Sequence, residues 1–243
     1  MHIIQMLGIL SAVFFVSLLL MCLFHDKLSS PVLNYMFVCS CALFFFFWNY
    51  SMYEHRAGDV NGFMVLENIS PFISAVISIT PLLNTKVRDF AYSAIAFLGF
   101  GMFVAMFISP EVEFFYNFHQ DAKFIHVSEA ICHLIMGLYG FYLVLSDKVK
   151  LNLRSYAKAL VFIYSAIGLG VFLNLCFHQS NFGMDMYGNY SIYFLDIFDS
   201  FAATLVAYIF GVLATITIGF VVCVLIDWLC RRPKKLHHKE DAE

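Results

Sequence analysis

Long apolar runs, separated by short polar connectors, account for most of the chain. Each run is close to the roughly 20 apolar residues that a helix needs to cross a bilayer. Backbone groups in lipid must be paired within their own segment, so these runs predict helices. The alternating ten-residue pattern of membrane strands is absent from the sequence. Seven spans are predicted, at residues 3–24, 32–50, 62–83, 90–109, 124–145, 156–177 and 201–229.

The expected fold is therefore an all-α polytopic membrane protein with seven transmembrane helices. Residues 1–230 form a single transmembrane domain, and residues 231–243 form a tail that is first basic and then acidic. The chain is 61% apolar and 13% charged, whereas a soluble domain is about 45–50% apolar and about 25% charged. Its net charge of −3 argues against nucleic acid as a partner, because nucleic-acid-binding domains carry a basic surface. Membrane lipids are the expected partners.

The distribution of basic residues predicts the orientation. If the seven spans alternate, 12 of the 14 Lys and Arg residues fall on one side of the membrane and 2 on the other. Positive residues accumulate on the cytoplasmic side, so the N-terminus is expected outside and the C-terminus in the cytoplasm of a cell (plasma or inner) membrane. The first span lacks a basic leader and a small-residue cleavage site, so we expect it to stay as a membrane anchor.

Seven cysteines lie in or beside the predicted spans, and no two of them form a C-x-x-C pair. This pattern predicts neither a disulfide framework nor a zinc knuckle. The cysteines are interpreted as small apolar residues, with palmitoylation as an alternative at positions such as Cys230.

Polar residues inside the spans gather toward the predicted outer side. A charged side chain at the bilayer centre costs roughly 2.5–3.5 kcal/mol, so each one needs a reason. Four helices contribute such residues at a similar level, which predicts a polar cavity that opens outward. The residues are Glu67 and Asn68 in the third span, His126, Ser128, Glu129 and His133 in the fifth, Asn174 and His178 at the end of the sixth, and Asp196 and Asp199 at the start of the seventh.

The fifth span carries the most informative pattern. His126, Glu129 and His133 are spaced i, i+3 and i+7, which places them on one helical face. Gly137 and Gly140 continue this face, where small residues allow a neighbouring helix to approach closely. His133 lies roughly 13 Å below the outer boundary at 1.5 Å per residue.

Three roles are open for His133: a general base, a metal ligand with His126 and Glu129, or an interhelical hydrogen-bond donor. The H-x-x-E-x-x-x-H spacing is not an established ligand pattern, and no cofactor is expected. The choice is therefore mainly between an acid–base group and a structural one.

Three stretches of the chain resemble the YwaF-like family of bacterial integral membrane proteins. Residues 90–110, with Gly99, Gly101 and a closing Ile-Ser-Pro, are similar to the fourth helix of that family. The run from 131 to 144 that contains His133, and Asn174 followed by Asn-Phe at 181–182, resemble its fifth and sixth helices. The resemblance covers residues 62–229. A relative of the family is a cysteine-dependent phospholipid acyltransferase, so the resemblance implies lipid chemistry with His133 in the position of the family histidine.

The nucleophile of that relative does not carry over to this chain. Leu66 stands at the cysteine position of the third span, and Glu67 stands beside it at the adjoining histidine position. Cys132 points about 100° away from His133 around the helix, so it is a poor substitute. What remains is an acid–base pair, Glu67 and His133, which we expect to approach one another within hydrogen-bond or one-water distance.

Two classes of function follow. The first is an intramembrane lipid hydrolase or acyltransferase-like enzyme that uses His133 with Glu67, with Asn68 or Asn174 orienting the substrate. The second is a non-enzymatic protein that binds or transports a small molecule, a lipid or protons. The seventh span has no Lys for a retinal Schiff base, and the inner halves of the spans lack the polar lining of a channel.

Overall fold

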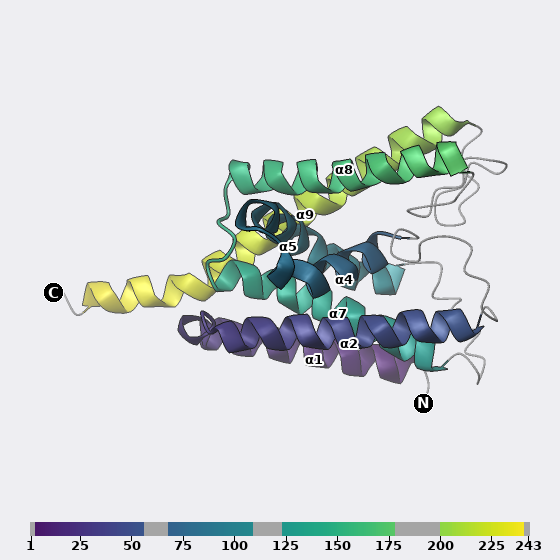
Figure 1. The fold of residues 1–243 in the computed structure, drawn as a ribbon. Coiled ribbons are helices and arrows are strands. Elements are labelled where there is room, and N and C mark those ends of the chain that lie inside the picture. The colour runs from purple at the N-terminus through teal and green to yellow at the C-terminus, as the bar shows by residue number, and fades with distance from the viewer. Residues whose placement is uncertain (1–2, 56–67, 109–122, 178–199, 241–243) are drawn as a thin grey trace.

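The computed structural model describes residues 3–55, 68–108, 123–177 and 200–240, and every regular element in these ranges is helical. The fold is therefore all-α, as expected (Figure 1). The α-helices are α1 (Ile3–Leu23), α2 (Pro31–His55), α4 (Ile69–Ile79), α5 (Thr85–Ile108), α7 (Lys123–Leu145), α8 (Leu153–Phe177) and α9 (Phe201–Glu240), and the short 3-10 helices are η1 (His25–Lys27) and η2 (Thr80–Leu82).

Five of the α-helices are long and apolar enough to cross a membrane, which is consistent with a membrane-embedded protein. Their candidate spans are Pro31–Tyr50, Thr85–Val104, Val127–Leu145, Leu153–Phe177 and Ala202–Arg231. Two shorter apolar helical stretches, Gly8–Leu23 and Ile69–Leu82, occur where the first and third spans are predicted. The seven helices run in alternating directions along the bundle (Figure 1).

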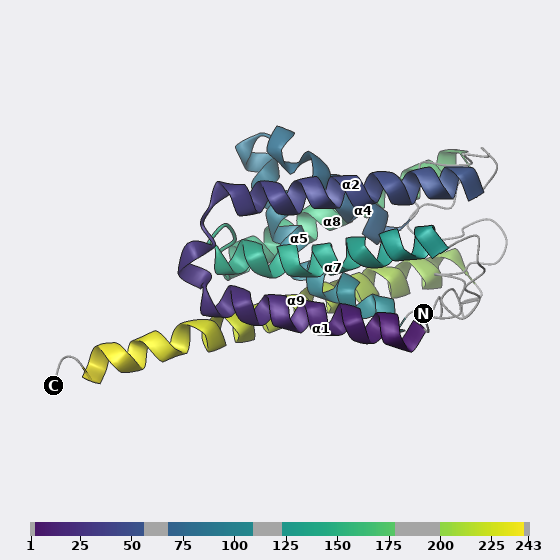
Figure 2. The same cartoon turned by 90° about the horizontal axis from the view of Figure 1, so that it is seen from below.

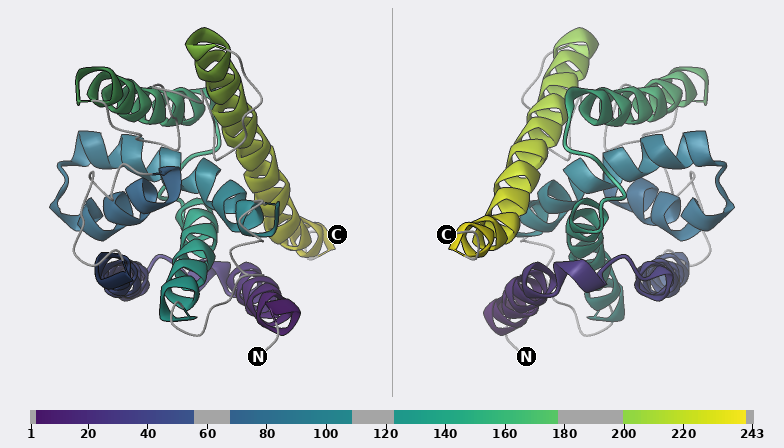
Figure 3. Two further views of the ribbon diagram at one scale, coloured as in Figure 1. Left: turned by 90° about the vertical axis from the view of Figure 1, so that its right-hand side faces the viewer. Right: turned by 90° about the vertical axis from the view of Figure 1, so that its left-hand side faces the viewer.

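Helix α7 forms the centre of the bundle. Of its candidate span, 83% is buried inside the protein, compared with 22% for the spans of α2, α8 and α9. In the end-on views, α7 lies between α1 and α2, with α5 along its remaining side (Figure 3). Most residues of α7 are therefore buried against other helices rather than exposed on the outside of the bundle.

Small residues bring α5 and α7 into close contact. A Cβ atom added to Gly140 would lie 3.0 Å from the carbonyl oxygen of Ile95, and one added to Gly99 would overlap the carbonyl oxygen of Met136. A Cβ atom on Gly137 would lie 2.9 Å from the Phe14 ring of α1. The expectation that Gly137 and Gly140 admit a close neighbour is confirmed, since larger residues would push these helices apart.

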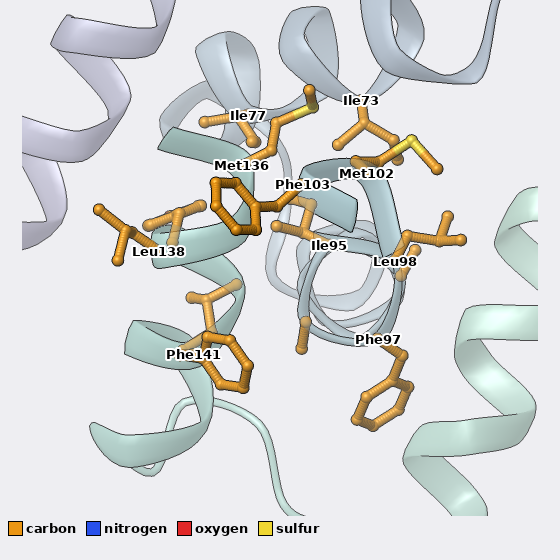
Figure 4. Packing of buried hydrophobic residues seen from close by; sticks show 14 of the residues in the cluster. Ile73, Ile77, Ile95, Phe97, Leu98, Met102, Phe103, Met136, Leu138 and Phe141 are labelled. Atoms are coloured by element: carbon orange, nitrogen blue, oxygen red, sulfur yellow. The ribbon is translucent and has the colours of Figure 1, made fainter. Parts of the chain in front are cut away.

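Bulky apolar side chains fill the space around this crossing. Figure 4 shows Ile73 and Ile77 of α4 packed near Ile95 of α5 and Met136 of α7. On the side facing α1, the Phe14 ring stacks on Phe103 with a centroid distance of 3.9 Å and an angle of 8°. This packing holds four helices around one continuous core.

Buried hydroxyl groups tie α7 to the start of α2. The Tyr139 hydroxyl donates a hydrogen bond of 3.0 Å to Asn34 Oδ1, and the Tyr142 hydroxyl donates one of 3.3 Å to the carbonyl oxygen of Ser30. Tyr139 is fully buried, so its hydroxyl needs such a partner.

A disulfide bond joins Cys22, in the last turn of α1, to Cys230 of α9. Their Cα atoms are 5.1 Å apart, within the usual range for a disulfide. The prediction that the cysteines form no disulfide is therefore wrong for this pair, and palmitoylation of Cys230 would require the bond to be reduced. The two cysteines are 208 residues apart in sequence, so no local spacing pattern could reveal them.

Helix α9 continues beyond the disulfide to Glu240 and extends away from the other helices (Figures 1 and 2). The predicted boundary at residue 230 therefore lies within a continuous helix. Arg231 connects this helix to the loop after α7: its Nη2 is 2.7 Å from Asp147 Oδ1, and its Nε is 2.6 Å from Asp227 Oδ1.

Candidate functional site

The predicted polar residues come from helix ends that meet at one end of the bundle. The start of α4, the start of α7, the end of α8 and the start of α9 all lie at the end opposite the C-terminus (Figure 1). The structure describes Asn68, Ser128, Glu129, His133 and Asn174, whereas Glu67, His178, Asp196 and Asp199 and the side chain of His126 lie outside the described residues. The expected approach of Glu67 to His133 therefore also lies outside the described residues.

His133 lies in the middle of α7 and is only 7% exposed. Its Nδ1 is 2.9 Å from the carbonyl oxygen of Glu129, one turn earlier on the same helix. Because a carbonyl oxygen can only accept, this hydrogen bond requires Nδ1 to carry the proton. A neutral His133 then presents Nε2 with its lone pair, which is the form of a histidine that can accept a proton.

The Nε2 atom of His133 has no hydrogen-bond partner among the described residues. Within the same residues, the buried side-chain atoms without a partner are Asn68 Oδ1 and Ser146 Oγ, and His133 Nε2 is not one of them. The imidazole ring lies beside Trp48 of α2, with 6.2 Å between the ring centroids, which keeps one side of the ring against an apolar neighbour.

Asn68 lies directly before α4, in extended conformation with φ −144° and ψ 168°. Residues in this position commonly accept a hydrogen bond from the first turn of the helix, but the side chain of Asn68 makes no such bond. Its Oδ1 is buried without a partner among the described residues. A buried carbonyl-type oxygen of this kind is suited to accept a hydrogen bond from a bound molecule or water.

Sulfur and hydroxyl groups of α2, α4 and α7 meet in the core, a feature that the sequence analysis missed. Cys41 Sγ is 3.7 Å from the carbonyl oxygen of Ser74, and the Ser74 hydroxyl is 3.6 Å from Met136 Sδ. Cys132 interacts with Ser74 and with Cys41. All four of these side chains are fully buried. In the sequence these residues look like ordinary small or apolar core residues, so nothing indicated that their side chains meet.

The thiol of Cys132 and the ring of His133 share Trp48 as a neighbour but differ in their other contacts. Cys132 packs with Trp48 and the partly buried Phe44 and Phe45 and interacts with Ser74, whereas the His133 imidazole bonds back to its own helix. Adjacent residues on a helix diverge by about 100°. That Cys132 is poorly placed to give its proton to His133 stays a prediction from this helix geometry.

The metal alternative receives no support from the described residues, in which no three His, Cys, Asp or Glu side chains are placed to hold an ion. The side chain of His126 lies outside the described residues.

Two other predicted site residues interact with neighbouring residues. Asn174 is fully buried on α8, and Glu129 on α7 is half-buried.

Comparisons with protein-family models, with curated proteins and with solved structures found no match to this chain. The class that the fold itself supports is an all-α protein with several membrane-length apolar helices.

Proposed function

We propose that this chain spans a cell membrane seven times, with the N-terminus outside and the C-terminus in the cytoplasm. The alternating directions of the helices support this topology (Figure 1), as does the 12-to-2 division of basic residues in the sequence. Membership of the YwaF-like family is part of the same proposal and rests on the sequence motifs alone.

Within this topology, the chain acts as an intramembrane lipid hydrolase or acyltransferase-like enzyme with His133 as the general base. One observation carries the proposal: the Nδ1 hydrogen bond to Glu129 sets the tautomer of His133, and Nε2 is left without a protein partner in the described part of the chain. A base must present its lone pair toward the proton it removes. Glu67 is the proposed acidic partner that stabilises the protonated imidazole.

Water is the nucleophile in this mechanism. As its oxygen attacks the acyl carbonyl carbon of a lipid ester, one of its protons moves to His133 Nε2. The ester C–O bond then breaks, and the imidazolium returns the proton to the leaving alkoxide, which gives a fatty acid and an alcohol. Asn68 Oδ1 accepts a hydrogen bond from the lipid headgroup region. His126, Glu129, Asn174, His178, Asp196 and Asp199 line the outward cavity in this proposal.

The test is fatty-acid release from phospholipids by the purified protein in vesicles. The change of His133 to Gln is expected to lower the rate at least about 100-fold, the lower end of the usual contribution of a general base. Glu67→Gln should have a similar effect, and the double variant should be no worse than either single one, because the two groups act as a unit. Measured hydrolysis in H133Q at the wild-type rate would refute the proposal.

A matched control separates water from a thiol as the nucleophile. Cys132→Ser changes the neighbouring residue on the same helix, whose side chain packs with Trp48 and the partly buried Phe44 and Phe45. This side chain diverges from that of His133 by about 100° around the helix. This variant is expected to retain hydrolysis. If C132S is as inactive as H133Q, with both proteins folded, the covalent mechanism of the resembling acyltransferase replaces the water mechanism.

A second candidate is a non-enzymatic lipid, small-molecule or proton carrier. The observation that favours it is that Asn68 Oδ1 and His133 Nε2 have no hydrogen-bond partner among the described residues. Two such atoms also suit a ligand that is bound and released unchanged. Under this alternative, lipid extracted with the protein is recovered intact after incubation. Binding would then depend on His133 and Asn68 while no ester is cleaved.

A further inference from the structure

The disulfide between Cys22 and Cys230 lies at the end of the bundle opposite to the predicted polar cavity. Cys22 is in the last turn of α1, and Cys230 is near the point where α9 leaves the other helices (Figures 1 and 2). The C-terminus lies beyond the same end, so the proposed topology places this bond at the cytoplasmic surface. Glutathione and thioredoxin keep cytosolic thiols reduced, and the disulfides that do occur in the cytosol are usually transient, either catalytic or redox-sensing.

The bonded cysteines are more accessible than most of the free ones. Cys22 and Cys230 are both half-buried, whereas the free cysteines Cys41, Cys132 and Cys223 are fully buried in the core. Exchange between a thiol and a disulfide requires a thiolate to reach one of the two bonded sulfur atoms. The Cys22–Cys230 bond therefore meets the condition for exchange with a soluble thiol, and the core cysteines do not.

The two helices that the bond joins are otherwise held by different neighbours. Helix α1 packs mainly against α7, and helix α9 packs mainly against α5. On α1, the Phe14 ring lies against Gly137 of α7 and stacks on Phe103 of α5. On α9, Gly219 lies against the backbone of Phe97. The disulfide is therefore the principal direct link between α1 and α9 in the described part of the chain.

A second, weaker link holds α9 at the same level. Arg231, the residue after Cys230, forms an ion pair of 2.7 Å with Asp147 in the loop after α7. The Arg231 side chain is 39% exposed and that of Asp147 is 74% exposed, and ion pairs with this exposure contribute little to stability. Reduction of the disulfide would leave this exposed ion pair as the remaining tie of the Arg231 turn to the loop.

We propose that Cys22 and Cys230 form a redox switch, which exchanges with a soluble dithiol of the cytoplasm and thereby tethers α1 to α9 or releases it. The switch rests on the proposed topology and is independent of the His133 chemistry.

The exchange proceeds in two steps. A thiolate of the dithiol attacks one sulfur of the bond, the S–S bond breaks, and the departing cysteine sulfur takes up a proton. The second thiol of the dithiol then loses its proton and attacks the mixed disulfide, and the other cysteine leaves and is protonated. The cysteine pair gains two electrons and two protons in total, and the dithiol is oxidised to a disulfide. The reverse reaction restores the tether.

The first experiment measures the state of the bond in growing cells that express the full chain. The cells are quenched with acid and denatured, and their thiols are labelled with a maleimide of known mass. The oxidised form then carries five labels and the reduced form seven. Growing cells should contain the seven-label form, the thiol oxidant diamide should convert it to the five-label form, and removal of diamide should restore it.

Sealed membrane vesicles free of cytosol separate the switch from the topology. A membrane-impermeant reductant should reduce the bond in inside-out vesicles, which expose the cytoplasmic face, and not in right-side-out vesicles. Reduction only in right-side-out vesicles would refute the topology and, with it, the access of cytosolic dithiols to the bond. A bond that is reduced only in inside-out vesicles but stays oxidised in growing cells would leave the topology intact and overturn the switch.

Amide hydrogen exchange of the purified protein tests whether the bond controls the helices. Reduction should make exchange in residues 224–231 of α9 at least about tenfold faster, because loss of a disulfide lowers the stability of the segments that it joins. Cys22→Ser should exchange at the reduced rate with or without reductant. The matched control Cys39→Ser, which removes an exposed free cysteine of α2, should respond to reductant as the wild type does.

The comparison of oxidised and reduced wild-type protein needs no variant to fold. Equal exchange in residues 224–231 of the two forms would overturn the switch, because the bond would then be a cross-link without a conformational effect.

Discussion

Replacement of Gly219 by alanine is expected to destabilise the contact between α5 and α9. A Cβ atom at this position would overlap the carbonyl oxygen of Phe97 and lie 2.8 Å from its carbonyl carbon and 3.3 Å from its Cα. All three atoms belong to the backbone of α5, so no side-chain rotation can make room. The two helices must move apart, and the contacts around Phe97 must be rebuilt.

Gly211 provides the matched control for the size of this effect. It lies on the same helix, and a Cβ atom there would meet no other atom within 4 Å. Both substitutions gain the higher helix propensity of alanine, up to about 1 kcal/mol. The difference between the two variants therefore isolates the steric clash. Overpacking of a well-packed interior costs about 1–3 kcal/mol, so G219A should be less stable than G211A by about that amount.

Equilibrium unfolding of both variants in mixed micelles measures this difference, and Cys223 adds a local probe. Cys223 is fully buried one turn after Gly219, and its thiol donates a hydrogen bond of 3.5 Å to the carbonyl oxygen of Ala96. Separation of α5 and α9 should expose it to maleimide in G219A, while Cys41, between α2 and α4, should remain protected. If G219A and G211A have equal stability within about 0.5 kcal/mol, the close helix contact does not exist and the reasoning fails.

Two further predictions concern other contacts of the bundle. Because Cys22 is bonded to Cys230, an alkylating reagent should modify only the five free cysteines of the denatured protein before reduction, and all seven cysteines after it. Mass spectrometry counts the modified cysteines. Seven modified cysteines before reduction would exclude the bond. Asn34→Leu should lower the free energy of unfolding by about 1–3 kcal/mol, because it leaves the buried Tyr139 hydroxyl without its acceptor. Adding Tyr139→Phe should recover part of that loss, and a double variant with the summed loss of both single variants would show that the hydrogen bond does not contribute.

The hydrophobic pattern predicts the helices well because their length is dictated by simple physics. Five predicted spans correspond to membrane-length helices, and the small residues Gly137 and Gly140 do admit a close neighbour. The particular neighbour, α5, and its register with α7 depend on which carbonyl oxygens face each glycine. That information arises only when two distant segments pack, so the partner of each glycine could not be derived from the sequence.

The helix ends that carry most of the predicted polar residues do lie together at one end of the bundle (Figure 1), whereas His133 lies in the middle of α7. The meeting of these helix ends could be predicted from the sequence, whereas the contacts deeper in the core could not. The convergence of Cys41, Ser74 and Met136 escaped notice because each is small or apolar when viewed alone. The disulfide between Cys22 and Cys230 escaped notice for a related reason, since each cysteine lies on a different helix far apart in the chain.

The hydrogen bond of His133 weighs against a purely structural role for this residue. A histidine that holds helices together must donate to, or accept from, a different helix, and the His133 Nδ1 hydrogen bond ends on its own helix at Glu129. The remaining nitrogen has no partner among the described residues. A structural histidine in the core of a membrane bundle would leave that nitrogen unsatisfied at a cost in stability. An Nε2 that meets a water molecule, a substrate or Glu67 removes this cost, and each of these three partners is one that acid–base chemistry requires.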